Sequence, residues 1–299
     1  MALPTVHYDR IAAATNSSLH SETMPKFHAL LVAAGWTVQF INADAIGTGT
    51  SALPAWDKTP VINTSCGIAI YSMPLNGHTR AWYVKVEPGW GANVTSGYSF
   101  KVTIGTGQTA GVLSGAGNEF QYLGNAVSTG NEVIMAASND GFAYHHAGTA
   151  LGSIRWINVE RLREFDGTVT SDLGVLGGAP AGSFPDQAPY WGCVAYRASD
   201  GYEYATNGYM LLARPSSYTV FVASSTVSTT SANGETGIPI GPVNTSARAW
   251  GIPRLALVVG QLDAVTNSDH PVLVDGSVKL YRAPAAFVAN HYILLVAIE

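Results

Sequence analysis

The sequence predicts a mainly β protein of antiparallel, sandwich-like sheets, with one short N-terminal helix packed on the first sheet. Three observations support this fold class. The 299 residues include 32 glycines, which suits a fold with many tight turns. The strand-like runs are rich in Val, Ile, Tyr, Phe and Trp, which favour strands. Asn-Gly or Asp-Gly dipeptides separate such runs at four places, and these dipeptides favour the type I′ turns of β-hairpins.

The predicted helix occupies TMPKFHALLVAAG near the start of the chain. Thr23 is a suitable N-cap, and Pro25 falls in the first turn, where its missing N–H costs little. The apolar face at helical spacing comprises Phe27, Leu30, Leu31 and Ala34. Gly35 is expected to end the helix at the C′ position, where a left-handed conformation is needed.

A strand is expected directly after the helix, in WTVQFINA. Side chains alternate between the two faces of a strand, so Trp36, Val38 and Phe40 are expected to share one face. The helix would then pack against the sheet that this strand begins.

Four hairpins are expected along the chain. Their turns are Asn76-Gly77, Asp140-Gly141, Asn207-Gly208 and Asp275-Gly276. Pro74 should shorten the strand before the first turn, because proline lacks a backbone donor. The final run HYILLVAIE has the length of a strand and enough apolar residues to be buried.

Three stretches read as loops, and one of them divides the chain. They are residues 43–60, 166–189 and 224–247, of which 166–189 is richest in Gly, Pro and Ala. We therefore expect an N-terminal helix-plus-β domain (1–165), a Gly/Pro-rich linker or loop (166–189) and a C-terminal β domain (190–299). Long loops are unusual inside a compact domain, so these tracts also suit extended arms ordered by neighbouring subunits.

Composition excludes several classes of partner. Charged residues make up 12% of the chain, about half the usual share. The net charge is −5 and Lys and Arg do not cluster, so we expect no nucleic-acid partner. The first residues do not resemble a secretion signal, and no apolar run reaches the ~20 residues that span a bilayer, so no membrane insertion is expected. The two cysteines, Cys66 and Cys193, suit buried free thiols, although the sequence leaves open whether they pair.

Residues that could carry chemistry do not assemble into a recognisable motif. His145 and His146 are adjacent on a predicted strand, so they point to opposite faces and do not suit one metal. The glycine-rich stretches GTGQTAG and GVLGGAPAG lack the Lys-Ser/Thr ending of a phosphate loop and read as turns and flexible loop. No G-x-S-x-G nucleophile motif occurs. We therefore expect no catalytic, cofactor-binding or metal-binding residues, no cofactor and no enzymatic activity.

Acidic and basic residues alternate in WINVERLREFDG. Here Glu160 and Glu164 stand among Arg161 and Arg163, a pattern that favours a solvated strand edge or cross-strand ion pairs. Hydrolysis of a glycan would instead need two carboxylates that face each other across a cleft at about 5–10 Å.

Two groups of aromatic residues suit either packing or recognition. One lies in AWYVKVEPGWGANVTSGYSF, and the other begins at Tyr190. Cross-strand packing explains most of them. Trp90 and Trp191 are the candidates for contacts with a subunit interface or a glycan.

Five stretches carry a resemblance to a class of proteins. They are KFHALLVAAGWTV, WYVKVEPG, PRLALVVG, VLVDGSVKLYRAP and YILLVAIE. In these stretches the chain resembles structural proteins of tailed bacteriophage virions. Such proteins often open with a short helix ending in Gly-Trp-Thr-Val, continue as a β-rich body and close on an Asp-Gly hairpin and an apolar strand. The resemblance implies a virion component without fixing its place among tail, baseplate, neck and capsid decoration.

The resulting expectation is a non-enzymatic structural component of a tailed phage particle, favoured at a tail-associated position. It would assemble through subunit interfaces as a symmetric homo-oligomer, which suits an apolar, weakly charged chain. Its partners would be other copies of itself and other virion proteins, and it would be made in the host bacterial cytoplasm and located in the virion. One alternative is a receptor-binding module for host-surface glycan, and a second is a capsid decoration protein. A glycan-cleaving enzyme is a further rival.

Overall fold

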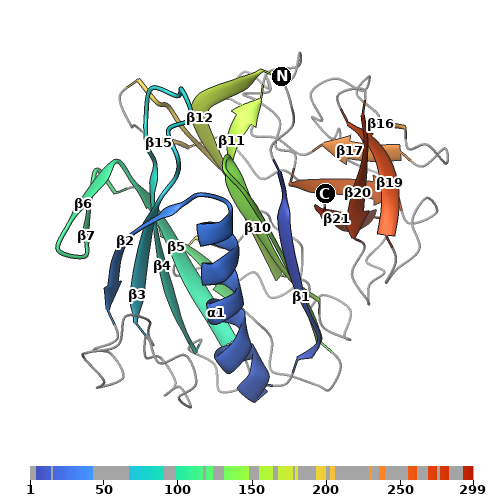
Figure 1. Cartoon of the computed structure of the whole chain (residues 1–299), viewed down its shortest axis with the longest axis horizontal. Helices are drawn as coiled ribbons and strands as arrows, with labels where there is room; N and C mark the ends of the chain where they lie inside the picture. The colour runs from blue at the N-terminus through green and yellow to red at the C-terminus, as the bar shows by residue number, and fades with distance from the viewer. Residues whose placement is uncertain are drawn as a thin grey trace.

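A computed structural model provides the fold of the chain. It describes residues 5–14, 16–42, 67–90, 98–116, 119–123, 131–147, 155–163, 168–177, 179–180, 193–199, 203–205, 229–230, 236–239, 255–260, 269–274, 277–282 and 292–298. These residues form a mainly β protein with antiparallel sheets and one helix near the N-terminus (Figure 1), as the sequence predicts.

The described strands form three large sheets and one small hairpin. Sheet A follows the order β1 (His7–Ala14), β9 (Asn131–Ser138), β10 (Gly141–Ala147), β11 (Arg155–Arg163), β12 (Val169–Gly177), β14 (Cys193–Tyr196) and β15 (Glu203–Ala205). Sheet B follows the order β13 (Ala179–Pro180), β8 (Glu119–Leu123), β5 (Tyr98–Gly105), β4 (Tyr83–Trp90), β3 (Ile68–Ser72) and β2 (Thr37–Asn42). The C-terminal sheet follows the order β16 (Thr229–Thr230), β17 (Thr236–Pro239), β18 (Ala256–Gly260), β21 (Tyr292–Ala297), β20 (Ser277–Arg282) and β19 (Asp269–Val274). The small hairpin pairs β6 (Gly107–Thr109) with β7 (Val112–Ser114).

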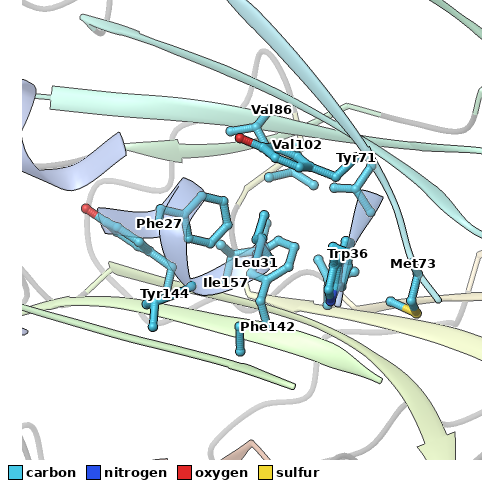
Figure 2. Packing of buried hydrophobic residues seen from close by; sticks show 14 of the residues in the cluster. Phe27, Leu31, Trp36, Tyr71, Met73, Val86, Val102, Phe142, Tyr144 and Ile157 are labelled. Atoms are coloured by element: carbon cyan, nitrogen blue, oxygen red, sulfur yellow. The ribbon is translucent and has the colours of Figure 1, made fainter. Parts of the chain in front are cut away.

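Helix α1 (Asn16–Ala33) lies between sheets A and B (Figure 1). Figure 2 shows Phe27 and Leu31 between Tyr71 of sheet B on one side and Phe142 of sheet A on the other. The Phe27 and Phe142 rings meet edge to face, with centroids 5.0 Å apart, a favourable geometry for aromatic pairs. The apolar face predicted from the sequence is therefore buried against two sheets at once.

The helix begins earlier than the sequence predicts. It starts at Asn16, so Thr23 is not the N-cap and Pro25 lies inside the helix. An internal proline costs a helix about 3 kcal/mol because it removes one backbone hydrogen bond. The neighbouring side chains of Met24 and Phe27 are almost fully buried, and this tertiary packing offsets the local cost.

The helix ends as predicted, but the following strand departs from the expected pattern. Gly35 has a φ of 85°, and Trp36 N donates to Leu31 O at 3.0 Å, as in a Schellman motif. Trp36 is buried, whereas Val38 is exposed, so the expected shared face is wrong. Trp36 stands before β2, in the Schellman motif, so the alternation of the strand does not extend to it, and the pairing of β2 with β3 shifts register between Val38 and Phe40.

Two of the predicted turns lie within the described residues. Asn76 and Gly77 have φ values of 43° and 85°, as a type I′ turn requires, and β3 ends before Pro74. The hairpin of β9 and β10 is also present, but its turn residues are Asn139 and Asp140, one position earlier than predicted. Gly141 pairs within the strand instead. A Cβ there would lie 2.6 Å from Glu160 Cα of β11, so this close approach requires glycine.

The other hairpin predictions have mixed outcomes. Val274 of β19 pairs with Ser277 of β20, which confirms the hairpin at Asp275-Gly276, although these two turn residues lie outside the described residues. Asn207-Gly208 also lies outside them. Within GTGQTAG, Ala110 and Gly111 join β6 to β7 with φ values of 48° and 82°, so this stretch contains a regular hairpin.

Sheet A is the central layer of the molecule. One face packs on α1 and sheet B, and the other packs on the C-terminal sheet (Figure 1). On the second face, Ile134, Ala136 and Ala143 contact a cluster that includes Tyr281 and Val296. Strands covered on both faces bury consecutive residues, which explains why β9 is buried from residue 132 to residue 138.

The segment expected to be a linker contains part of sheet A. Residues 169–177 form β12, which pairs with β11 before it and with β14 after it. The apolar residues Leu173 and Val175 are fully buried in the core, which outweighs the high glycine content of this stretch. Residues from both expected domains therefore share one sheet, and the division into separate domains stays a prediction.

Candidate functional site

A buried ion-pair cluster lies at the turn between β9 and β10. Both oxygens of the Asp140 carboxylate accept from arginines of β11: Arg161 Nη1 lies 3.5 Å from Oδ1 and Arg163 Nη2 lies 3.3 Å from Oδ2. Arg161 and Arg163 are two residues apart on β11, so their side chains lie on the same face of the strand and reach the same carboxylate. We call Asp140, Arg161, Arg163 and His78 the Asp140 cluster.

Arg161 joins the Asp140 cluster to sheet B. Its side chain is fully buried, and its Nη2 donates to the backbone oxygens of Pro74, at 2.7 Å, and Arg80, at 3.2 Å. Both oxygens belong to the β3–β4 connection, residues 73–82. Burial lowers the pKa of Arg161, and the Asp140 carboxylate opposes this effect, but a guanidinium stays charged in proteins. One guanidinium thus binds an acidic group and two carbonyls of another layer.

His78 brings a titratable group to the same place. Its Nε2 lies 3.7 Å from Asp140 Oδ1, and its side chain is 13% exposed. Burial lowers the pKa of His78 below its ordinary value of 6.5, and the charges of Arg161 and Arg163 lower it further, whereas Asp140 raises it. His78 is therefore neutral at pH 7.

Further hydrogen bonds hold the β3–β4 connection on sheet A. Thr79 N donates to Ser171 Oγ at 3.0 Å, and Trp82 Nε1 donates to Ser171 O at 2.9 Å. Arg80 Nε donates to Ala198 O, and its guanidinium carbon lies 5.8 Å from the centroid of the Trp82 ring. Backbone and side-chain groups therefore fasten this connection at several points along β12 and the turn after β14.

A second set of ion pairs links sheet A to the C-terminal sheet. Glu132 is fully buried and pairs with Arg10 of β1 and with Arg282 of β20, whose Nη2 lies 3.7 Å away. Arg282 Nη1 also binds Asp269 Oδ1 at 3.0 Å. The acidic group of one sheet is thus neutralised by arginines from two sheets.

Glu160 makes a further link between the same two sheets. Its buried carboxylate accepts from the backbone N–H of Leu255 at 2.9 Å, and from Asn158 Nδ2 at 3.4 Å. Leu255 stands directly before β18 of the C-terminal sheet. Adjacent residues of β11 therefore serve opposite faces, since Glu160 faces the C-terminal sheet and Arg161 faces sheet B.

These contacts show what the buried charges do in the fold. A carboxylate whose two oxygens each bind a guanidinium is an ionic cross-link, and removing one partner of such a buried pair is strongly destabilising. Among the described residues, no group of three or more His, Cys, Asp or Glu side chains could hold a metal ion. The arrangement joins layers of the fold through charge.

The structure describes only part of the residues singled out from the sequence. Trp90 ends β4 and pairs with Tyr98 of β5, but its side chain lies outside the described residues, as does all of Trp191. Cys66 and the side chain of Cys193 also lie outside them, so their pairing stays open.

The charged residues of β11 differ from what their sequence context suggests. The expected solvated strand edge at Glu160, Arg161 and Arg163 is wrong, because β11 lies between β10 and β12 and all three residues are buried. Ion pairing does occur, but Arg161 and Arg163 pair with Asp140, which lies in the β9–β10 turn and not on a neighbouring strand. His145 is fully buried on β10, and the side chain of His146 is outside the described residues.

The Asp140 cluster was missed at the level of sequence. The sequence predicts Asp140 only as a turn residue, and no local pattern singles out His78. One available signal was the pair Arg161 and Arg163, set two apart in a chain with few charges, next to apolar positions that are typical of a buried strand.

Comparisons with known proteins add no identification. No protein-family model matches this chain, and no curated protein matches it. Among the described residues, no helix is both long and apolar enough to cross a membrane.

Proposed function

We propose that this chain is a non-enzymatic structural component of a tailed phage particle, tail-associated, which assembles through subunit interfaces. The observation that supports this proposal best is the use of buried charges as links between layers. Arg161 joins sheet A to sheet B, and Arg282 joins the C-terminal sheet to sheet A. Such links favour a mechanical role, because they fix the positions of the layers relative to one another.

The chain has few charged residues, yet it places several of them in the interior. Only 12% of residues are charged, yet Glu132, Asp140, Glu160, Arg161 and Arg163 are all buried. Buried ion pairs stabilise a fold little compared with apolar packing, but in some proteins they favour one arrangement over alternatives. A particle subunit needs one fixed shape, because every copy must present the same surfaces to its neighbours.

Exposed apolar side chains suit contacts with neighbouring subunits. Val32, Val38 and Leu75 are exposed, and Leu75 lies in the β3–β4 connection, which comes close to the end of α1 at Gly35 and Pro74. The resemblance of the sequence to virion structural proteins supports the same reading. The proposed partners are other copies of the chain and other virion proteins.

Two measurements test the proposal together. Light scattering behind a sizing column should give the mass of a closed homo-oligomer, and mass spectrometry of purified particles should detect the chain at a fixed copy number. A monomer that is also absent from particles would contradict the proposal. A monomer found in particles would mean that the oligomer forms on a template such as the tail.

A further inference from the structure

His78 is enclosed by charged groups from two other elements. Asp140 faces it from the β9–β10 turn, and Arg161 and Arg163 face it from β11. The Asp140 oxygen nearest to His78 already accepts from Arg161, and the other oxygen accepts from Arg163. A positive charge on His78 would therefore enter a space that already holds two guanidinium groups around one carboxylate.

The same histidine is part of the segment that the cluster holds. His78 follows the Asn76-Gly77 turn, and the carbonyls that bind Arg161 lie on either side of it, at Pro74 and Arg80. A change at His78 thus acts in the middle of the β3–β4 connection.

We propose that the β3–β4 connection is an acid-sensitive latch, which opens from sheet A when His78 is protonated. Opening breaks the bonds of Arg161 to the two carbonyls and the bond of Thr79 N to Ser171 Oγ. This device goes beyond the proposed structural role, because it lets pH loosen one end of the contact between sheets A and B.

The direction of the pH effect follows from linkage. In the open state His78 is solvated and titrates near its ordinary pKa of 6.5, whereas burial and the two arginines lower its pKa in the closed state. The open state therefore binds more protons, and opening becomes more favourable as pH falls below 6.5. The opening constant should rise tenfold for each pH unit that separates the two pKa values, and the rise ends below the closed-state pKa.

Hydrogen exchange of the backbone amides measures this opening directly. Exchange of peptides covering residues 73–82 is compared at pH 7.5 and pH 5.0, after correction for the intrinsic rate. The wild type should lose protection at the lower pH, and His78→Gln should not, because glutamine stays neutral. Retained acid-dependent opening in His78→Gln would overturn the proposal.

His28→Gln is the matched control. His28 also has a pKa lowered by burial, but it bonds Tyr71 OH at 3.0 Å and has no contact with the Asp140 cluster among its described interactions. This variant should keep the acid-dependent exchange of residues 73–82, and its loss there would also overturn the proposal.

A titration of His78 in the wild-type protein tests the latch without relying on any variant. The ring resonance of His78, followed by NMR in protein with labelled histidine, should give a pKa below 6.5. For each pH unit by which that pKa lies below 6.5, the measured opening constant should rise tenfold. A pKa at or above 6.5 would refute the latch.

Discussion

The sharpest test of the buried cross-links is the substitution Arg161→Met, which keeps the aliphatic packing and removes the guanidinium. Four acceptors then lose this donor: the Asp140 carboxylate and the carbonyls of Asn139, Pro74 and Arg80. A buried polar group left without a partner costs about 1–3 kcal/mol, and breaking a buried ion pair costs about 3–5 kcal/mol. Arg163 still neutralises Asp140, so these costs do not add in full.

We therefore expect Arg161→Met to lower the free energy of unfolding by about 3–5 kcal/mol. At about 2–4 °C per kcal/mol, this corresponds to a fall in Tm of roughly 10 °C. Urea unfolding followed by tryptophan fluorescence gives the free energy, and calorimetry gives Tm. Arg161→Lys keeps the charge but cannot bind two carbonyls and a carboxylate in the same fork geometry, so it should fall between the wild type and Arg161→Met.

Lys85→Met provides the matched control. Lys85 Nζ pairs with Glu87 Oε2 at 2.6 Å, but both side chains are partly exposed and both lie on β4. Pairs of this kind contribute up to about 1 kcal/mol. If Arg161→Met destabilises the protein no more than Lys85→Met does, the interpretation of the Asp140 cluster as a cross-link between sheets is refuted.

Three further predictions use other parts of the molecule. Gly141→Ala should lower the urea midpoint more than Gly77→Ala does, because the new Cβ at position 141 would press on the β11 backbone. At position 77 the new Cβ would meet no other atom, so the cost is backbone strain alone, about 1–2 kcal/mol. Equal losses in the two variants would contradict this prediction. Burial raises the pKa of Tyr71, so the contribution of the neutral hydroxyl to stability is present below pH 10 and is lost as pH rises through the raised pKa. Between pH 9 and 11, the Tm of Tyr71→Phe should therefore fall less than the Tm of the wild type. Parallel Tm curves for the two proteins would contradict this prediction. Replacing Trp90 and Trp191 by Ala should leave binding to host cell-wall preparations unchanged in a pull-down, whereas a loss would favour the glycan-binding alternative.

Local sequence patterns predict those features that depend on a few neighbouring residues. The Asn76-Gly77 turn and the end of the helix at Gly35 follow from backbone preferences of glycine and asparagine, which need no distant partner. The start of the helix could not be predicted in the same way, because Pro25 by itself favours the first turn, whereas here it lies inside a helix that packs between two sheets.

The candidate site depends on contacts between residues far apart in the chain. His78, Asp140 and Arg161 belong to three separate segments, and none of them carries a local signal of the others. The sequence did show Arg161 and Arg163 two residues apart, but it could not decide whether their strand was an edge or a centre. That depends on which strands pair on either side.

The sequence by itself determined the fold class, the Asn76-Gly77 turn, the end of the helix at Gly35 and the apolar face of the helix, because each follows from the conformational preferences or the spacing of neighbouring residues. Only the tertiary structure decided that β11 lies between β10 and β12 in a sheet that is covered on both faces. The same fact turns Glu160 and Arg161 from surface charges into links to opposite layers. A charged side chain on the surface is solvated by water, whereas a buried one must be paired with an opposite charge or a hydrogen-bond partner.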